Sequence, residues 1–330
     1  MNNEITVDIP LRITVSVGGQ ALTRVVGSSV ESREIKKGLE RVDIDPDYGN
    51  RKGYDASFLG IDVPLPTLNP EQRRNAAKNS MVDAGQDNTV LHYHHFSLVM
   101  NRRRQLAYYT AVNINGARSR KPERAGDQWY YDPRIAETEQ IGEDLYARNK
   151  LDRGHLVRRL DPAWGSISEA LNANNDTFHF TNCSPQHAGF NQSSETWQGI
   201  ENYLLNSAQQ DRKALTIFTG PVLTDEDPLY RGVRLPLHFW KIALFAKNDG
   251  TLSVTAYLLS QEDLVGDVSG LERFDPEVFQ VTVDEIIART GLDFSYLLDA
   301  QIELAQERGI ERSPEDLPRK KLAHTGEIKV

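Results

Sequence analysis

Hydrophobic and polar positions alternate along several stretches of this chain, a period-two pattern that predicts β-strands. Residues 88–101 and 105–116 read as successive strands, and the polar run 101–105 between them reads as a hairpin turn. Residues 237–247 and 251–260 form a second predicted hairpin across the turn sequence Asn-Asp-Gly. The further predicted strands, of which the first could equally be an extended arm, are 4–17, 178–185 and 214–223.

Helical spacing of apolar residues, or a composition that favours helix, occurs in fewer segments than the alternating pattern of strands. The predicted helices are 29–41, 70–86, 195–210 and 281–309. The polar tail 312–330 predicts little regular structure, and no internal repeat occurs. Mostly antiparallel strands with a few long helices predict an α+β fold.

Composition narrows the class of protein. The chain has 330 residues, of which 39% are hydrophobic and 26% charged, enough to bury a core. No apolar run approaches the ~18 residues of a membrane span, and the start lacks the pattern of a signal peptide. Cys183 is the one cysteine, so no intrachain disulfide can form. We therefore expect a cytoplasmic protein with no membrane partner.

The net charge of −9 argues by itself against a polyanionic partner, but the charge is unevenly distributed. Residues 102–159 hold 13 Lys and Arg against 8 Asp and Glu, a balance of +5. Such a segment can form a local phosphate-binding surface within an acidic protein. The alternative is that these arginines are scattered, solvated side chains, as we expect for the turn Arg102–Arg104.

Four sequence features suggest a common chemistry. They are Asp-Arg-Gly-His at 152–155, Thr-Asn-Cys-Ser-Pro-Gln at 181–186, Phe-Asn-Gln at 190–192, and the pair Trp197 and Glu201 on one helix face. Phosphodiester hydrolysis needs a base that works near neutral pH, a hard divalent cation and a group that holds phosphate.

His155, Asn191 and Arg153 could fill these three roles. Histidine matches the required pKa, one amide oxygen suffices for a magnesium ion that keeps most of its waters, and arginine donates paired hydrogen bonds to phosphate. Asp152 and Gly154 would shape the strand end that presents the histidine.

The ordered set of motifs resembles the DNA/RNA non-specific endonucleases of the ββα-metal superfamily, over roughly residues 43–298. Further similar stretches are His-Phe-Ser-Leu-Val-Met-Asn, Trp-Tyr-Tyr-Asp-Pro-Arg-Ile, Phe-Thr-Gly-Pro-Val-Leu and Thr-Gly-Leu-Asp-Phe. The resemblance implies a ββα-metal nuclease fold, with a central, mostly antiparallel sheet flanked by helices. It also implies a Mg²⁺ cofactor that Mn²⁺ could replace, DNA and RNA as substrates, and 5′-phosphate products.

The resemblance also implies a role for each matching residue. His155 corresponds to the general base, Asn191 to the direct protein ligand of magnesium, and Arg153 to an arginine near the phosphate. Glu201 corresponds to a glutamate that orients metal-bound waters, and Asn182 supports the site.

One spacing departs from the family pattern. Trp197 follows Asn191 by six residues, two more than in the family. At ~100° per residue, two extra residues turn a continuous helix by about 200°. Asn191 and Glu201 keep the family's relative facing only if the helix bulges or begins after Asn191, for example with a cap at 193–194. Alternatively, Glu195 orients the metal waters.

No motif identifies the phosphate-contacting arginine that the family carries upstream of the Asp-Arg-Gly-His sequence. Arg118, Arg120 and Arg124 are candidates. Arg158 and Arg159 would point to opposite faces if they lay on a strand, so at most one of them, with Arg158 as our candidate, would face substrate.

The histidines near residue 92 suggest a metal site as another interpretation. His92 and His94 would share one face of a strand, but no spaced partner completes a zinc site.

Two other functions are alternatives to the nuclease. The chain could be a catalytically silent nucleic-acid-binding module that kept the fold, or a regulated toxin or defence effector that depends on assembly.

We expect three parts: an N-terminal extension at 1–42, the endonuclease domain at 43–298 and a polar C-terminal tail at 299–330. The two extensions could mediate a homo-oligomer or bind a regulatory protein.

Overall fold

The computed structural model describes residues 43–82, 87–123, 126, 128–191, 197–262 and 278–301, with short strand pieces at 16–17, 20–21 and 320–321. The chain divides into two compact units, Met1–Glu40 and Arg41–Val330. In the first unit, β1 (Ser16–Val17) pairs antiparallel with β2 (Gln20–Ala21). The rest of the strand predicted at 4–17, and the helix predicted at 29–41, lie outside the described residues.

The second unit is built on an eight-stranded sheet in which every neighbouring pair of strands is antiparallel. Its strands, in spatial order, are β14 (Lys320–Lys321), β13 (Val278–Val281), β12 (Leu252–Ser260), β11 (His238–Ala246), β8 (Ala214–Val222), β5 (Leu106–Asn115), β4 (Phe96–Asn101) and β3 (Val90–His92). The predicted α+β class with a mostly antiparallel sheet is confirmed.

Two small strand pairs and short helices complete the described chain. The pairs are β6 (Leu151–His155) with β7 (Cys183–His187), and β9 (Leu229–Tyr230) with β10 (Val233–Arg234). The α-helices are α1 (Pro70–Asn75), α2 (Ile167–Asp176), α3 (Ala188–Asn191), α4 (Trp197–Gln210) and α6 (Val283–Thr290). The 3-10 helices are η1 (Tyr48–Asn50), η2 (Gly116–Arg118), η3 (Glu137–Glu139), η4 (Glu143–Leu145), η5 (Phe180–Asn182) and η6 (Ser295–Leu297).

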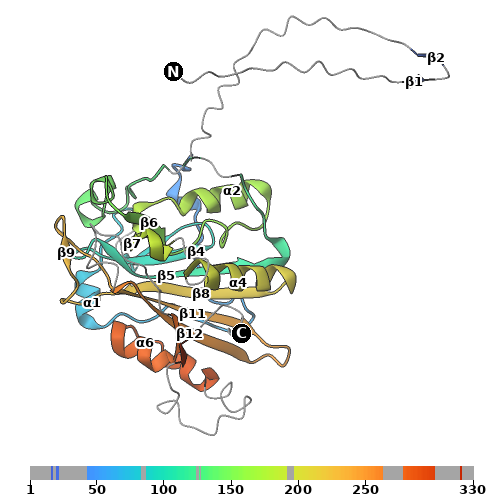
Figure 1. Ribbon diagram of the computed structural model, residues 1–330. Helices are drawn as coiled ribbons and strands as arrows, with labels where there is room; N and C mark the ends of the chain where they lie inside the picture. The colour runs from blue at the N-terminus through green and yellow to red at the C-terminus, as the bar shows by residue number, and fades with distance from the viewer. Residues whose placement is uncertain are drawn as a thin grey trace, which may run out of the picture. The chain divides into compact units, whose positions relative to one another are not determined.

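Both faces of the sheet are buried, which gives three layers (Figure 1). Successive strand residues point to opposite faces, so Phe239 and Trp240 of β11 belong to different cores. On one face, Leu204 and Leu205 of α4 pack with Phe239. On the other face, Ile286 of α6 packs with Trp240. The layer with α4 also contains Leu156 and Val157, directly after the predicted general base.

The hairpin predictions are confirmed where turn chemistry is local. β4 and β5 pair around Arg102–Gln105, with Gln105 at φ 59°. β11 and β12 pair around the Asn-Asp-Gly turn, where Gly250 has φ 85°, a conformation that glycine adopts at little cost.

The prediction of one continuous strand over residues 88–101 is wrong. The chain reverses between β3 and β4, and His95 sits at φ 66° in the turn. The three histidines therefore diverge: His92 bonds Ser97, His94 bonds Asp176, and His95 bonds Pro162 and Glu169. In the described part of the chain, no group of three or more His, Cys, Asp or Glu could hold a metal.

Three other element predictions were too long. Residues 180–182 form η5 rather than the first part of a strand, and β7 begins at Cys183. The helix predicted at 70–86 ends at Asn75, and Ala76 instead bridges to Asn101 of β4. The helix predicted at 281–309 stops at Gly291, whose φ of 67° gives a left-handed C-cap.

A buried ion pair anchors the start of the second unit. The Arg51 guanidinium donates to the Asp176 carboxylate at 2.8 Å, and His94 approaches the same carboxylate at 2.8 Å. Burial alone would raise the pKa of Asp176, but the hydrogen bonds from His94 and Arg51, together with the positive charge of Arg51, lower it to about 2. Among the described residues, no helix has the length and hydropathy needed to cross a bilayer.

Candidate active site

The Asp-Arg-Gly-His and Thr-Asn-Cys-Ser-Pro-Gln motifs meet as neighbouring strands. β6 pairs antiparallel with β7, which sets His155 opposite Cys183 and Gly154 opposite Ser184. α3 follows β7 at once, contacts both strands and ends at Asn191. Residues from three separate motifs are thus assembled by one β-β-α unit.

Gly154 lets the Gln186 side chain of β7 pack closely against β6. A Cβ atom at this position would overlap the side-chain amide of Gln186, which is fully buried. A glycine inside a strand commonly marks such a close approach.

His155 is the last residue of β6 and is partly buried. Its ring centroid lies 4.6 Å from that of Trp129 and 5.1 Å from that of Phe178, with the Phe178 ring edge-on. The aromatic rings limit the orientations open to the imidazole, which is suited to accept a proton. The sequence did not predict Trp129 and Phe178 as neighbours of His155, because no characteristic spacing links these aromatic residues to the motif.

Asn182 fixes the backbone that follows His155. Its Oδ1 accepts a hydrogen bond from the Val157 N–H at 3.0 Å, and its Nδ2 donates to the carbonyls of Val157 and Thr177, both at 2.9 Å. The Leu156 N–H donates to the Asn182 carbonyl at 2.9 Å. The fully buried Asn182 therefore holds the chain on the C-terminal side of His155.

Arg153 lies on the same face of β6 as His155, two residues away, and Asp152 lies on the other face. The Arg153 guanidinium is paired with the Glu143 carboxylate, and its centre lies 5.2 Å from the Tyr146 ring centroid. Glu143 was not predicted, since nothing in its sequence context indicates that η4 packs beside β6.

The strand interpretation of Arg158 and Arg159 is wrong, because β6 ends at His155. Arg158 Nη2 donates to Asn202 Oδ1 of α4 at 2.9 Å. Arg159 Nη1 donates to Asn174 Oδ1 at 3.1 Å and to the Pro122 carbonyl at 3.2 Å. Both guanidinium groups thus link the segment after His155 to other elements.

Arg118 and Arg120 lie on an exposed segment that pairs with the chain at 163–165. Arg120 Nε donates to the Gly165 carbonyl at 3.1 Å, and the Arg118 guanidinium lies 5.8 Å from the Trp164 ring centroid. Both side chains are exposed, as phosphate contacts require. Arg124 lies outside the described residues.

Asn191 lies in α3, and Trp197 and Glu201 lie in α4. Residues 192–196, which hold the insertion, the proposed cap at 193–194 and Glu195, lie outside the described residues.

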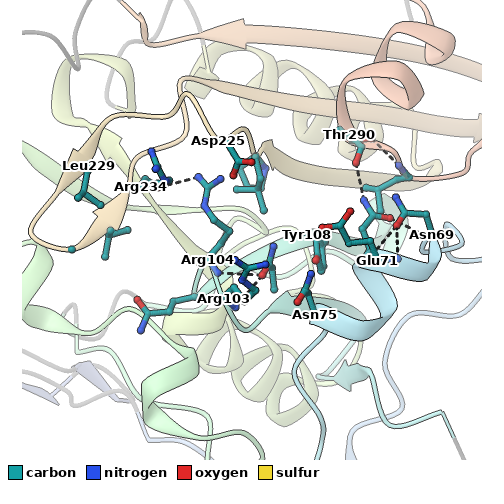
Figure 2. Close-up of a pocket in the computed structure, with 18 residues that line it drawn as sticks. Asn69, Glu71, Asn75, Arg103, Arg104, Tyr108, Asp225, Leu229, Arg234 and Thr290 are labelled. Carbon is teal, nitrogen blue, oxygen red and sulfur yellow. Dashed lines mark hydrogen bonds between the residues drawn. The ribbon is translucent and has the colours of Figure 1, made fainter.

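A separate pocket of about 500 Å³ lies between α1, the β4–β5 turn and the β9–β10 hairpin (Figure 2). None of its lining residues belongs to the four motifs. Arg104 forms part of its wall, donating to the Thr224 and Arg234 carbonyls and pairing with Asp227. This arginine is thus committed to holding the β8–β10 connection, whereas we expected a solvated side chain.

The structure combines a β-β-α unit with a large antiparallel sheet, and a histidine ends one strand of the unit. Comparisons with known proteins identify the class of protein. The family model of the DNA/RNA non-specific endonucleases matches residues 74–301, and the chain belongs to this family.

Comparisons with individual proteins give further similarities. The chain is 42% identical over 263 residues to the uncharacterized protein y4fB of Sinorhizobium fredii, covering 75% of this chain but 39% of that protein. It is 25% identical to a nuclease of Nostoc, covering 68% of this chain and 80% of the relative. A crystal structure of the EndoG/EndoGI complex is similar with a TM-score of 0.48 and 19% identity, covering 64% of this chain and 87% of that chain.

Proposed function

We propose that the protein is a Mg²⁺-dependent endonuclease that hydrolyses phosphodiester bonds of both DNA and RNA. The observation that carries the proposal is the β6–β7–α3 unit, which brings the His155 strand, the Asn182 segment and the Asn191 helix into contact. Membership of the non-specific endonuclease family supports the reaction class.

His155 is the proposed general base. A partly exposed imidazole at a strand end, held between aromatic rings, can take a proton from a water molecule while its ring stays oriented. Asn182 is the proposed positioning residue for His155, because its amide group fixes the backbone at Val157.

Asn191 is the proposed magnesium ligand. Its amide oxygen is a hard donor of the kind that magnesium binds in proteins. The residues therefore fit magnesium, and manganese accepts the same type of oxygen donor. When bound, the cation would stabilise the negative charge that develops on the phosphate. Glu201 on α4 is proposed to orient waters near this position.

Arg153 is proposed to contact the scissile phosphate after exchanging its partner. Its ion pair with Glu143 is a surface pair, since the Glu143 side chain is 61% exposed, and such pairs contribute little stability. A phosphodiester has two non-bridging oxygens that share one negative charge, and both can accept hydrogen bonds from the same guanidinium. Asp152 shapes the strand, and Arg118, Arg120 and Arg158 are proposed to contact neighbouring phosphates.

Contacts that go mainly to phosphate and sugar give weak sequence preference and accept both DNA and RNA. We propose that the 3′ oxygen leaves, which yields 5′-phosphate ends.

We also keep the proposed division of the chain into residues 1–42, 43–298 and 299–330. We propose that the two extensions control the activity by forming a homo-oligomer or by binding a regulatory protein. A cytoplasmic location likewise stays a prediction.

Plasmid cleavage with and without a chelator tests the proposal. We expect cleavage in magnesium, none in chelator, and a loss of about 10²–10⁴-fold in His155→Ala. His238→Ala is the matched control, because His238 is a partly exposed histidine outside the motifs. A wild-type protein that binds but never cuts would instead be the silent binding module, and an unchanged rate in His155→Ala would refute the assigned base.

A further inference from the structure

The turn of the β9–β10 hairpin contains an arginine in an unfavourable backbone conformation. Tyr230 pairs with Val233, so Arg231 and Gly232 form a two-residue turn, with φ angles of 49° and 82°. Positive φ at both central positions matches a type I′ turn, whose first position is normally filled by Asn, Asp or Gly. An arginine held in this conformation indicates that its side chain has a task that a better turn former could not perform.

The Arg231 guanidinium holds the turn that begins with η4. Its Nη1 donates hydrogen bonds to the carbonyls of Asp144 at 2.7 Å and Ala147 at 2.8 Å, and reaches the Leu145 carbonyl at 3.3 Å. The last carbonyls of a helical turn have no partners within it, and a cation beside them is favourable. Arg231 therefore fixes the chain from Asp144 to Ala147.

The same hairpin contacts this segment at two further places. Val233 of β10 belongs to the core cluster that contains Leu145 and Leu151. Asn149 Nδ2 donates to the Leu145 carbonyl at 2.6 Å and to the Tyr230 hydroxyl at 3.3 Å. The stretch from η4 to the start of β6 thus packs directly against the hairpin.

The segment held by Arg231 carries two groups that contact Arg153. The Glu143 carboxylate accepts a hydrogen bond from Arg153 Nε at 3.0 Å, and the Arg153 guanidinium lies 5.2 Å from the Tyr146 ring centroid. The buried Tyr146 is fixed in turn, since its hydroxyl lies 3.4 Å from Cys183 Sγ of β7. A displacement of this segment would therefore release the orientation of the Arg153 guanidinium.

We propose that Arg231 is a positioning residue for Arg153 and acts through η4, which presents Glu143 and the Tyr146 ring to the guanidinium. This positioning does not depend on the reaction. Its consequence for cleavage rests on the proposed function, in which Arg153 contacts the scissile phosphate. A guanidinium that is already oriented loses less conformational entropy when it binds phosphate, so substrate binds more tightly.

Arg231→Asn tests the proposal without weakening the turn. Asn-Gly is a preferred pair for a type I′ turn, and the Arg231 side chain is exposed, so the change suits the backbone and leaves no hole in the core. The affinity for a short DNA duplex, measured in the His155→Ala background, should fall about 3–10-fold. In the catalytically intact background, KM should rise by a similar factor with little change in kcat.

Three comparisons identify the cause of such a loss. Arg231→Lys keeps a cationic donor and should recover part of the affinity. Arg153→Met/Arg231→Asn should bind no more weakly than Arg153→Met, because Arg231 acts through Arg153. Arg231→Asn with unchanged affinity and KM would show that the arginine serves only the turn, and multiplying effects in the double variant would likewise overturn the proposal.

Arg212→Asn is the matched control. Arg212 is an exposed arginine at φ 54° in another turn, so its replacement removes the same charge from the same backbone conformation. It should leave affinity and KM unchanged. An equal loss in Arg212→Asn and Arg231→Asn would mean that net charge is responsible, which contradicts the positioning role.

Amide hydrogen exchange separates this inference from the proposed function. The Tyr146 N–H donates to the Glu143 carbonyl at 3.0 Å, and its exchange should become about 10-fold faster in Arg231→Asn but not in Arg212→Asn. Faster exchange in a protein that neither binds nor cuts nucleic acid would support the contact with η4 and contradict the nuclease. Unchanged exchange in Arg231→Asn would overturn the positioning role whatever the activity.

Discussion

At the scale of single residues, we propose two different tasks for the asparagines of this site. Asn182 directs its amide group at backbone atoms on both sides of its own segment, which leaves it committed to structure. Asn191 lies in α3, which contacts β6 and β7, and is proposed to bind the cation. Residue type alone does not separate these two proposed roles.

Asn191→Ala removes the proposed magnesium ligand. We expect the magnesium concentration for half-maximal cleavage to rise at least about 10-fold, because substitutions in a metal site typically weaken affinity by about that much or more. The maximal rate should fall as well. Cleavage rate measured against magnesium concentration gives both values.

Asn206→Ala is the matched control for this change, since Asn206 is an exposed asparagine on α4. It should leave the magnesium curve where it is. The same half-saturation and maximum in Asn191→Ala as in the unchanged protein would mean that another residue holds the cation.

The ordered motifs of the sequence indicated His155 and Asn191, whose roles remain proposals, and the elements that carry them, β6 and α3, are in contact. The sequence did not indicate the residues that approach from elsewhere in the chain. The partners Trp129 for His155 and Glu143 for Arg153 depend on how the irregular segment before β6 folds. Such contacts follow from tertiary packing and have no periodic pattern to reveal them.

At the scale of elements, the β6–β7 pair sets the geometry of the site. The register places Gly154 opposite Ser184, with the Gln186 side chain filling the space that a Cβ atom would need. His155 is the next residue, so a displacement of β6 at Gly154 would move the proposed base directly.

Gly154→Ala should reduce cleavage by about 10–100-fold, because displacing a reacting group by about 1 Å can cost as much as 10²-fold. The double variant Gly154→Ala/Gln186→Ala should recover part of this loss, since it removes the side chain that the new Cβ meets. Initial cleavage rates and thermal unfolding should be measured together.

Gly49→Ala serves as the control, because its added Cβ would meet the Asp47 side chain at 3.1 Å in an exposed turn. It should change the rate little. Wild-type cleavage by Gly154→Ala would show that the close approach of β6 and β7 is unnecessary for the reaction.

Elements with local turn signals were predicted correctly, and elements interrupted by long-range contacts were not. The Asn-Asp-Gly turn specifies its own hairpin. His95, in contrast, adopts a positive φ where Pro162 and Glu169 hold its ring, and its sequence suggests only a continuing strand. The same holds for 180–182, where a 3-10 turn interrupts the predicted strand and carries Asn182 to the backbone after His155.

At the scale of the whole molecule, the negative net charge conceals a basic segment. Part of its positive charge is already committed, because Arg104, Arg134 and Arg153 have carboxylate partners. Arg118 and Arg120 are exposed and belong to a segment paired with residues 163–165, in the chain that follows His155. We therefore propose these two arginines as contacts for phosphates beyond the proposed cleavage site.

Replacing Arg118 and Arg120 together with alanine should make DNA binding less sensitive to salt. Each phosphate contact contributes about −0.9 to the slope of log affinity against log salt concentration, so the slope should become shallower by up to about two units. The affinity for single-stranded DNA, duplex DNA and RNA should fall alike, because phosphates carry no base information. Binding is measured on short oligonucleotides in the His155→Ala background, which suppresses cutting.

A charge-matched control comes from two arginines outside the basic segment. Arg74 on α1 and Arg289 on α6 lie in other elements, so their double replacement changes net charge equally without altering Arg118 or Arg120. That variant should retain the original slope. Equal slopes in both double variants would show that net charge, rather than contacts from Arg118 and Arg120, governs the salt response, and the phosphate track would have to lie on other arginines.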